Sequence, residues 1–373
     1  MIPVCVPLLG EKELSYVTDC VKTNWISSKG KYVEEFERKF AEYCGCKYGI
    51  TTTSGTTAIH LALSSLGLGK GDEVIVPAFT MIGSVFPIVY CGAKPVLVDA
   101  EPETWNLNVD QLEEKITSRT KAIMPVHIYG HPCNMDPITK IAKKHGLYVV
   151  EDAAEAHGAE YKGKKAGGIG DAGCFSFYAN KIITCGEGGM VVTNNEKVAQ
   201  HAAALKDLSF SDGKKRVYLH SEVGYNYRMT NLQAAIGLAQ FERINDFVEM
   251  RRKNASLYSE TLKSVSGITL PKEKDWAKNV YWMYSILVEP EFGMSRDELM
   301  TELEKKGIDT RSFFVPMNKQ PLFKDMHLFK DEKYPVAEEL SKKGLYLPSS
   351  SGLKPAEIQY VCDSIIDIQK NSK

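Results

Sequence analysis

Asp171-Ala-Gly-Cys-Phe-Ser-Phe-Tyr-Ala-Asn-Lys-Ile-Ile-Thr-Cys-Gly-Glu-Gly-Gly-Met190 is the most informative stretch of this chain. It sets one lysine, Lys181, between two apolar runs, Cys174 to Tyr178 and Met190 to Val192. Burial disfavours the ammonium form of a lysine and lowers its pKa, so that the amine becomes a nucleophile or Schiff-base former. Taken alone, the stretch favours a simpler interpretation, in which Lys181 closes a loop and reaches solvent.

Composition predicts an ordinary globular protein large enough for two domains. The chain has 373 residues, 43% of them apolar and 25% charged. Its net charge of −1 provides no field that would attract DNA or an anionic membrane, so we expect neither partner. No run approaches the roughly 18 apolar residues of a membrane span. We expect no signal peptide, because the charged residues Glu11 and Lys12 follow soon after Met1 in place of a long apolar stretch. Nine cysteines without a CxxC pair indicate no metal site and favour a reducing, cytoplasmic location.

Strands and helices alternate on both sides of the lysine stretch. Such alternation predicts an α/β fold with parallel strands joined by helical crossovers. A long helical stretch from Thr230 to about Val265 follows, and we place a domain boundary near residue 245, giving domains 1–245 and 246–373. The expected strands are 48–53, 73–76, 96–98, 122–126, 147–150, 174–178, 191–193 and 284–288, and the expected helices are 11–23, 33–44, 54–67, 110–116, 137–144, 297–305 and 355–369.

One motif is excluded by its context. Gly168-Ile-Gly-Asp-Ala-Gly173 matches the G-x-G-x-x-G pattern of dinucleotide-binding proteins. That pattern needs a strand before it and a helix after it. Here a polar loop precedes the glycines and a strand follows them, so no helix N-terminus is offered to a pyrophosphate. We predict no dinucleotide site at this position.

Other polar segments fall where α/β proteins bind ligands. Ser54-Gly-Thr-Thr57, at a strand-to-helix junction, can cradle a phosphate or simply cap the helix. Asp152 ends a strand, where it can pair with a heterocyclic nitrogen or serve as a cap or surface acid. The loop Gly224-Tyr-Asn-Tyr-Arg-Met-Thr-Asn231 can be a binding loop or a helix cap. An anion cradle, a strand-tip acid and a lysine are what pyridoxal 5'-phosphate (PLP) requires.

The chain resembles the DegT/DnrJ/EryC1/StrS family of nucleotide-sugar aminotransferases over essentially its whole length. The motifs that carry the resemblance are Ser54-Gly-Thr-Thr-Ala58, Glu151-Asp-Ala-Ala-Glu155, Phe175-Ser-Phe-Tyr-Ala-Asn-Lys181, Gly186-Glu-Gly-Gly189 and Gly224-Tyr-Asn-Tyr-Arg228. The resemblance implies a fold-type I, aspartate aminotransferase-like architecture. Its large domain would hold a mixed, mostly parallel sheet, and a smaller α+β domain would follow.

The resemblance also implies roles for individual residues. Lys181 would hold PLP covalently, Asp152 would pair with its ring nitrogen and Glu155 would lie near its ring hydroxyl. Gly55, Thr56 and Ser176 would contact the phosphate. Asn226 would reach the phosphate in a neighbouring subunit, which makes a homodimer with shared sites the expected assembly.

Two positions depart from the family pattern. Met81 stands where relatives carry an aromatic residue stacked on PLP; its thioether can pack on a ring, and Phe79 is the less favoured substitute. Val315, in the segment Arg311-Ser-Phe-Phe-Val-Pro-Met317, stands where the perosamine-forming branch has histidine. The remaining candidate substrate contacts are Trp25, Trp282, Tyr284, Lys29, Lys31, Arg311 and the Lys214-Lys-Arg216 run. The three aromatic residues can equally belong to the core, and for Lys29, Lys31 and the Lys214-Lys-Arg216 run a solvated surface is the favoured interpretation.

The reaction implied by the resemblance is amino transfer from L-glutamate to C4 of a nucleotide-linked 4-keto-6-deoxyhexose. GDP-4-keto-6-deoxy-D-mannose, giving GDP-perosamine, is the favoured substrate. A dTDP- or UDP-linked keto sugar is the alternative, and a non-catalytic regulator of the same fold is less favoured. Family members that dehydrate at C3 carry histidine at the lysine position, so Lys181 favours a transaminase.

Overall fold

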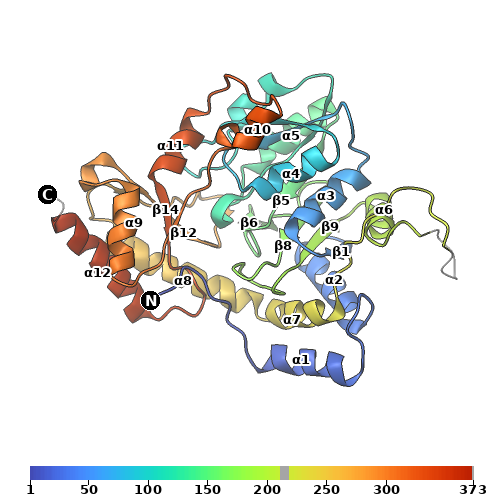
Figure 1. Ribbon diagram of the computed structural model, residues 1–373, viewed down its shortest axis with the longest axis horizontal. Helices are drawn as coiled ribbons and strands as arrows, with labels where there is room; N and C mark the ends of the chain where they lie inside the picture. Colours follow the sequence, from blue (N-terminus) through green and yellow to red (C-terminus); the bar gives the residue numbers. More distant parts are fainter. Residues whose placement is uncertain (211–217, 372–373) are drawn as a thin grey trace.

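The computed structural model describes residues 1–210 and 218–371 (Figure 1). Its centre is a seven-stranded sheet in the order β1-β9-β8-β5-β4-β2-β3. Pairs among β2, β3, β4, β5 and β8 are parallel, whereas β9 runs antiparallel to both β8 and β1. The strands are β1 (Tyr48–Thr52), β2 (Glu73–Pro77), β3 (Lys94–Val98), β4 (Thr120–Ile123), β5 (Tyr148–Asp152), β8 (Ala172–Ser176) and β9 (Gly189–Thr193).

The reversal at β9 follows from its connection. The chain returns from β8 through a loop without a crossover helix, and a loop of this kind joins antiparallel strands, whereas parallel strands need a longer crossover. This loop carries Lys181. The lysine stretch therefore folds as two neighbouring strands with Lys181 between them, and the predicted mixed, mostly parallel sheet is confirmed.

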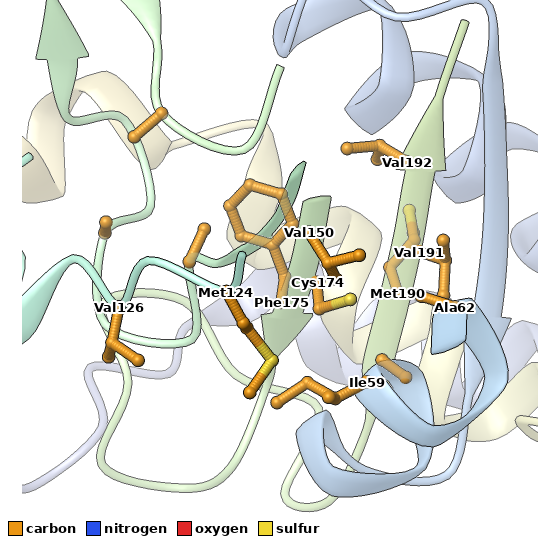
Figure 2. Close-up of a cluster of buried hydrophobic side chains, with 14 of the residues drawn as sticks. Ile59, Ala62, Met124, Val126, Val150, Cys174, Phe175, Met190, Val191 and Val192 are labelled. Atoms are coloured by element: carbon orange, nitrogen blue, oxygen red, sulfur yellow. The ribbon is translucent and has the colours of Figure 1, made fainter. Parts of the chain in front are cut away.

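The central sheet is buried because helices cover it. β2, β8 and β9 are buried at every residue, as expected for sheets covered on both faces. Figure 2 shows apolar side chains of α3 meeting those of the central strands in one cluster. The helices of this part are α1 (Glu11–Lys22), α2 (Lys31–Tyr43), α3 (Gly55–Ser65), α4 (Ile82–Tyr90), α5 (Met135–His145), α6 (Glu196–Lys206) and α7 (Asn231–Phe241).

A second, antiparallel sheet lies toward the carboxyl end of the chain, in the order β10-β12-β14-β13. Its own apolar cluster includes Tyr258, Ile286 and Leu303, which gives this part a separate core and confirms the predicted α+β character. The elements are α8 (Ile244–Leu262), β10 (Ile268–Thr269), β12 (Tyr284–Val288), α9 (Arg296–Lys305), β13 (Arg311–Ser312), α10 (Pro321–Asp325), α11 (Pro335–Lys343), β14 (Gly344–Leu347) and α12 (Pro355–Asn371). A small third sheet joins β11 (Ala277–Lys278), β6 (Glu160–Tyr161) and β7 (Lys164–Lys165).

Two predicted helices differ in the structure. The region 110–116 forms two short 3-10 pieces, Val109–Gln111 and Glu113–Lys115, instead of one helix. The long helical stretch is divided into α7 and α8, because Arg243 adopts φ −116° and ψ 11°, outside the helical range. The domain boundary near residue 245 falls at the start of α8 and stays a prediction.

Within the described residues, no helix combines the length and apolar character needed to cross a membrane.

Candidate active site

A cavity of about 380 Å³ opens where β5 and β8 end, beside the start of α3. Carboxyl ends of parallel strands are the usual ligand position in open α/β sheets. The cavity gathers residues that are far apart in the sequence. Among the residues that line it are Gly55, Thr56, Met81, Asp152, Glu155, Ser176 and Lys181, all predicted as cofactor contacts.

Lys181 lies on the loop between β8 and β9, with only 10% of its side chain exposed. Its Nζ is 3.8 Å from Glu155 Oε1 and 3.7 Å from the centre of the Trp282 indole ring. Burial lowers the pKa of Lys181 below its usual value, and the carboxylates of Glu155 and Asp152 oppose that effect. The structure thus gives this amine the desolvated surroundings expected of a reactive lysine.

Asp152 is the last residue of β5, and its carboxylate is fixed by hydrogen bonds at both oxygens. Ser84 Oγ donates to Oδ2 at 2.7 Å, and the Ala154 backbone N–H donates to Oδ1 at 3.1 Å. Thr80 Oγ1 lies 2.7 Å from Ser84 Oγ and donates to it, because the Ser84 proton is used on Asp152. Burial raises the pKa of Asp152, so a cation beside it would be strongly favoured.

Glu155 lies between Lys181 and a strained turn. The backbone N–H of Tyr129 donates to Glu155 Oε2 at 2.8 Å. Burial raises the pKa of Glu155 to about 7, while Lys181 and the Tyr129 N–H act against that rise. In this structure Glu155 can therefore hold or release a proton near neutral pH.

The start of α3 offers an anion site. Ser54 caps the helix by accepting from the Thr57 N–H at 3.2 Å, and the N–H groups of Gly55 and Thr56 lie in the first turn, where a helix provides no acceptors. A Cβ on Gly55 would lie only 2.7 Å from Ser176 Cβ. A glycine is therefore required for α3 to begin this close to the end of β8.

Met81 and Phe79 occupy different environments. Met81 lines the cavity, is 48% exposed and precedes α4, where its Sδ accepts from the Gly83 N–H at 2.8 Å. Phe79 is buried among Tyr129 and Phe313 and does not line the cavity. Phe79 is therefore not placed to stack on a ring bound in the cavity, in contrast to Met81.

Three lining residues, Ser84, Phe314 and Tyr346, were not singled out from the sequence. Ser84 fixes Asp152, and Phe314 and Tyr346 form one wall of the cavity together with Trp282, which the sequence had left open between a site and a core position. Ser84 lies in the first turn of α4, four residues after Thr80, and this spacing is the only sequence signal for it. The aromatic wall comes from segments more than 100 residues after Lys181, so no local pattern predicts it.

The candidate substrate residues are dispersed. Trp25, Lys29 and Lys31 line a second hollow beside α2, in which Lys31 forms an ion pair with Asp19 at 2.8 Å. Asn226 is exposed and lies outside the cavity. The Lys214-Lys-Arg216 run lies outside the described residues.

The carboxyl-terminal candidates divide between surface and core. Arg311 is exposed on β13 and pairs with Asp309, and Val315 is exposed beside the lining residue Phe314. The prediction that Tyr284 contacts the substrate is corrected by its position in the second core. Its side chain is 2% exposed, stacks on Tyr258, and shares a hydrogen bond of 2.8 Å with Ser259 Oγ. It does not reach the cavity because β12 directs it into that core.

The glycine-rich stretch before β8 binds an internal carboxylate. Backbone N–H groups of Gly167, Ile169 and Gly170 donate to Glu151 at 2.8, 2.7 and 2.6 Å, and His127 Nε2 lies 2.9 Å from the same group. The N–H groups that would hold a pyrophosphate are thus already used. The predicted exclusion of a dinucleotide site agrees with this geometry.

The site and fold define an α/β enzyme built around a buried lysine. The sequence matches the DegT/DnrJ/EryC1/StrS aminotransferase family over residues 7–366, and the chain belongs to this family. It is therefore an aminotransferase, and the fold class expected from the sequence is confirmed.

Relatives and solved structures agree with this assignment. GDP-perosamine synthases from Escherichia coli O157:H7 and Caulobacter vibrioides are each 46% identical, covering 98% and 96% of this chain and 97% and 96% of their own. The structure of S. venezuelae DesV in complex with a ketimine intermediate has a TM-score of 0.91 at 33% identity, covering 99% of both chains. The PLP form of Spr1654 from Streptococcus pneumoniae has a TM-score of 0.93 at 28% identity, covering 100% of this chain and 99% of that chain.

Proposed function

We propose that this chain uses PLP to transfer the amino group of L-glutamate to C4 of a nucleotide-linked 4-keto-6-deoxyhexose. The favoured substrate is GDP-4-keto-6-deoxy-D-mannose, and the product is then GDP-perosamine. One observation carries the proposal: the buried amine of Lys181 shares a cavity with the strand-tip acid Asp152 and the anion site at the start of α3. The relatives named GDP-perosamine synthase, 43% to 46% identical over nearly the whole chain, support the choice of sugar.

The lining residues fit PLP in chemistry as well as in position. Asp152, buried and without a cationic partner in direct contact among the described residues, suits a protonated ring nitrogen. The first turn of α3 and the Ser176 hydroxyl suit a phosphate, and Gly55 allows the two to lie side by side because a Cβ there would be only 2.7 Å from Ser176 Cβ. Lys181 provides the amine that an aldehyde needs, and Met81 and the aromatic wall provide apolar surface for a ring.

When bound, PLP would supply the aldehyde that accepts an amino group and the ring that stabilises negative charge at the adjacent carbon. The chain provides the remaining chemistry. Lys181 Nζ would remove the proton from the α-carbon of glutamate and carry it to the former aldehyde carbon of PLP. Asp152 would hold the ring nitrogen in its protonated form, because its buried carboxylate at the end of β5 favours a cation beside it. Glu155 orients the Lys181 amine and is held in turn by the Tyr129 N–H.

The same proposal includes a homodimer with shared sites. Asn226 lies outside the cavity of its own chain and is exposed, as required of a residue that reaches the phosphate in a partner subunit. We also propose a cytoplasmic location, because none of the nine cysteines forms a disulfide in the structure.

Comparative turnover tests the substrate. Purified protein is supplied with L-glutamate and, separately, GDP-, dTDP- and UDP-linked 4-keto-6-deoxyhexoses, and 2-oxoglutarate and the amino sugar are quantified. We expect the GDP sugar to give the highest kcat/KM. A clear preference for the dTDP or UDP sugar would replace the substrate but keep the reaction, whereas amination of none of them would overturn the proposed function.

A further inference from the structure

Trp282 is the group closest to the amine of Lys181 for which neither the motifs nor the family match gives a role. It lies between β11 and β12, is 3% exposed and lines the cavity. The centre of its indole ring is 3.7 Å from Lys181 Nζ, a distance at which the ring face attracts an ammonium group. The amine also lies 3.8 Å from Glu155 Oε1.

Hydrogen bonds fix both the indole ring and the backbone of Trp282. Its Nε1–H donates to the backbone oxygen of Asn180 at 2.8 Å, which ties the ring to the residue preceding Lys181. The Trp282 backbone oxygen accepts from Arg251 Nη1 at 2.6 Å. Arg251 is itself buried and is fixed by Ser351 Oγ, which accepts from its Nε at 3.0 Å. These bonds leave the ring little freedom to move away from the amine.

One turn sets the position of both neighbours of the amine. Tyr129 adopts a positive φ of 52° and donates its N–H to Glu155 at 2.8 Å. Gly130 has φ 100°, and its backbone oxygen accepts from the Val280 N–H at 3.1 Å. A Cβ on Gly130 would lie 2.9 Å from the backbone nitrogen of Trp282. A residue other than glycine with φ above zero is uncommon, so the backbone of Tyr129 is strained, and such strain concentrates at functional sites. The turn therefore fixes the spacing between Glu155 and the tryptophan segment.

We propose that Trp282 is a positioning residue that holds the free amine of Lys181 against Glu155 and stabilises its protonated form. The proposal rests on the proposed function, in which Lys181 acts with its amine released from the cofactor. A released lysine side chain has several rotatable bonds, and freezing them at the reacting carbon is what makes proton transfer efficient. Trp282 restricts the movement of the Lys181 side chain on one side, and the Tyr129-Gly130 turn fixes the position of Trp282 relative to Glu155.

Four titratable groups face the amine from the surrounding elements: Glu155, Asp152, Cys5 and His157. Burial lowers the pKa of His157 to about 3, so this ring is neutral at working pH. Glu155 and Asp152 favour the ammonium form through their charges. Replacing Trp282 leaves all four groups in place, so a change in the titration of Lys181 reports the indole itself.

The test uses the full-length enzyme loaded with the amino form of the cofactor. Acetylation of Lys181 by acetic anhydride is followed against pH by mass spectrometry in Trp282→Leu, Trp282→Phe and the control Trp276→Phe. Trp276 lies six residues away, packs against Tyr161 and His131, and does not line the cavity. We expect Trp282→Leu to lower the measured pKa of Lys181 by about 1, and Trp282→Phe to lower it by less, since a phenyl ring binds cations more weakly than indole.

Kinetics provide the second readout. In Trp282→Leu we expect kcat to fall on the order of 10-fold with KM for glutamate nearly unchanged, because the residue confines the lysine rather than the donor. Trp282 variants that titrate and turn over like Trp276→Phe would overturn the proposal; if Trp282→Leu does not fold, a Trp282→Phe titration identical to the control overturns it. Wild-type protein that does not bind PLP at all would instead overturn the proposed function, so the two failures are distinguishable.

Discussion

At the scale of single residues, the site is an arrangement of buried charges with few partners. Lys181, Asp152 and Glu155 lie in one cavity, and burial opposes the charged form of each. The fold tolerates this arrangement because hydrogen bonds from Ser84 and from the Tyr129 N–H fix the two carboxylates. A bound cofactor with a cationic ring and an aldehyde would complete what the protein alone leaves unmatched.

The titration of Glu155 gives a prediction for the cofactor-free protein. The pKa of Glu155 is raised to about 7 in the folded protein. Between the ordinary pKa of a glutamate and pH 7, the folded chain therefore keeps a proton on Glu155 that the unfolded chain has released. Stability contributed by this group is therefore present at low pH and is lost as pH rises toward 7. Relative to Glu155→Gln, the wild-type free energy of unfolding should fall on the order of 2 kcal/mol between pH 5 and pH 7.5.

Urea unfolding of the two cofactor-free proteins across this pH range measures the difference. Glu196→Gln, which removes an exposed carboxylate on α6, serves as the control. Parallel curves for wild type and Glu155→Gln would mean that Glu155 is not a buried acid in the folded protein.

At the scale of elements, the glycine-rich loop before β8 is a structural device. Its N–H groups bind the carboxylate of Glu151, which is fully buried on β5 immediately before Asp152. His127 accepts from the Cys133 N–H at Nδ1 and so carries its proton on Nε2, which faces Glu151. This network fixes the end of β5, and through it the backbone that carries Asp152.

Replacing the network's central group should destabilise the fold. In Glu151→Gln the new NH₂ group faces donors, so we expect the free energy of unfolding to fall by about 3 kcal/mol. The matched variant Glu113→Gln removes an exposed glutamate paired with Lys144 and should change stability by less than about 0.5 kcal/mol. Chemical denaturation decides between them, and a Glu151→Gln protein as stable as Glu113→Gln would refute the structural role of the loop.

The strands, and the lining residues Lys181, Gly55 and Asp152, could be predicted from the sequence because each is marked by its immediate neighbours in the chain. Lys181 follows a buried strand and Gly55 begins a helix after one, and each signal lies within a few residues. The break between α7 and α8 depends on the backbone of one residue, Arg243, which carries no glycine or proline signal. Tyr284 and the aromatic wall depend on how the second sheet packs against the first, which no short pattern encodes.

At the scale of the whole molecule, Asn226, the residue proposed to contact the phosphate, does not line the cavity of its own chain. Asn226 lies in the exposed segment before α7, and the family resemblance implies that it acts in a partner subunit. If sites are shared, each one needs Lys181 from one chain and Asn226 from the other. The dimer would then be required for function rather than for stability alone.

Complementation between two inactive variants tests the shared site. Lys181→Ala and Asn226→Ala are each expected to be inactive or nearly so. After subunit exchange in an equimolar mixture, half of the dimers contain one intact site of two, so activity should return to about a quarter of the wild-type value. Mixtures that stay as inactive as their parents, despite exchange demonstrated by native mass spectrometry, would place Asn226 outside a shared site.

The central claim is that Lys181 holds the cofactor. The most direct measurement is borohydride reduction of the PLP-loaded enzyme, which fixes the cofactor to its lysine, followed by peptide mass spectrometry. We predict a single modified lysine, Lys181, and no modification in Lys181→Ala. Modification of a different lysine, or none in wild-type protein supplied with PLP, would contradict the account.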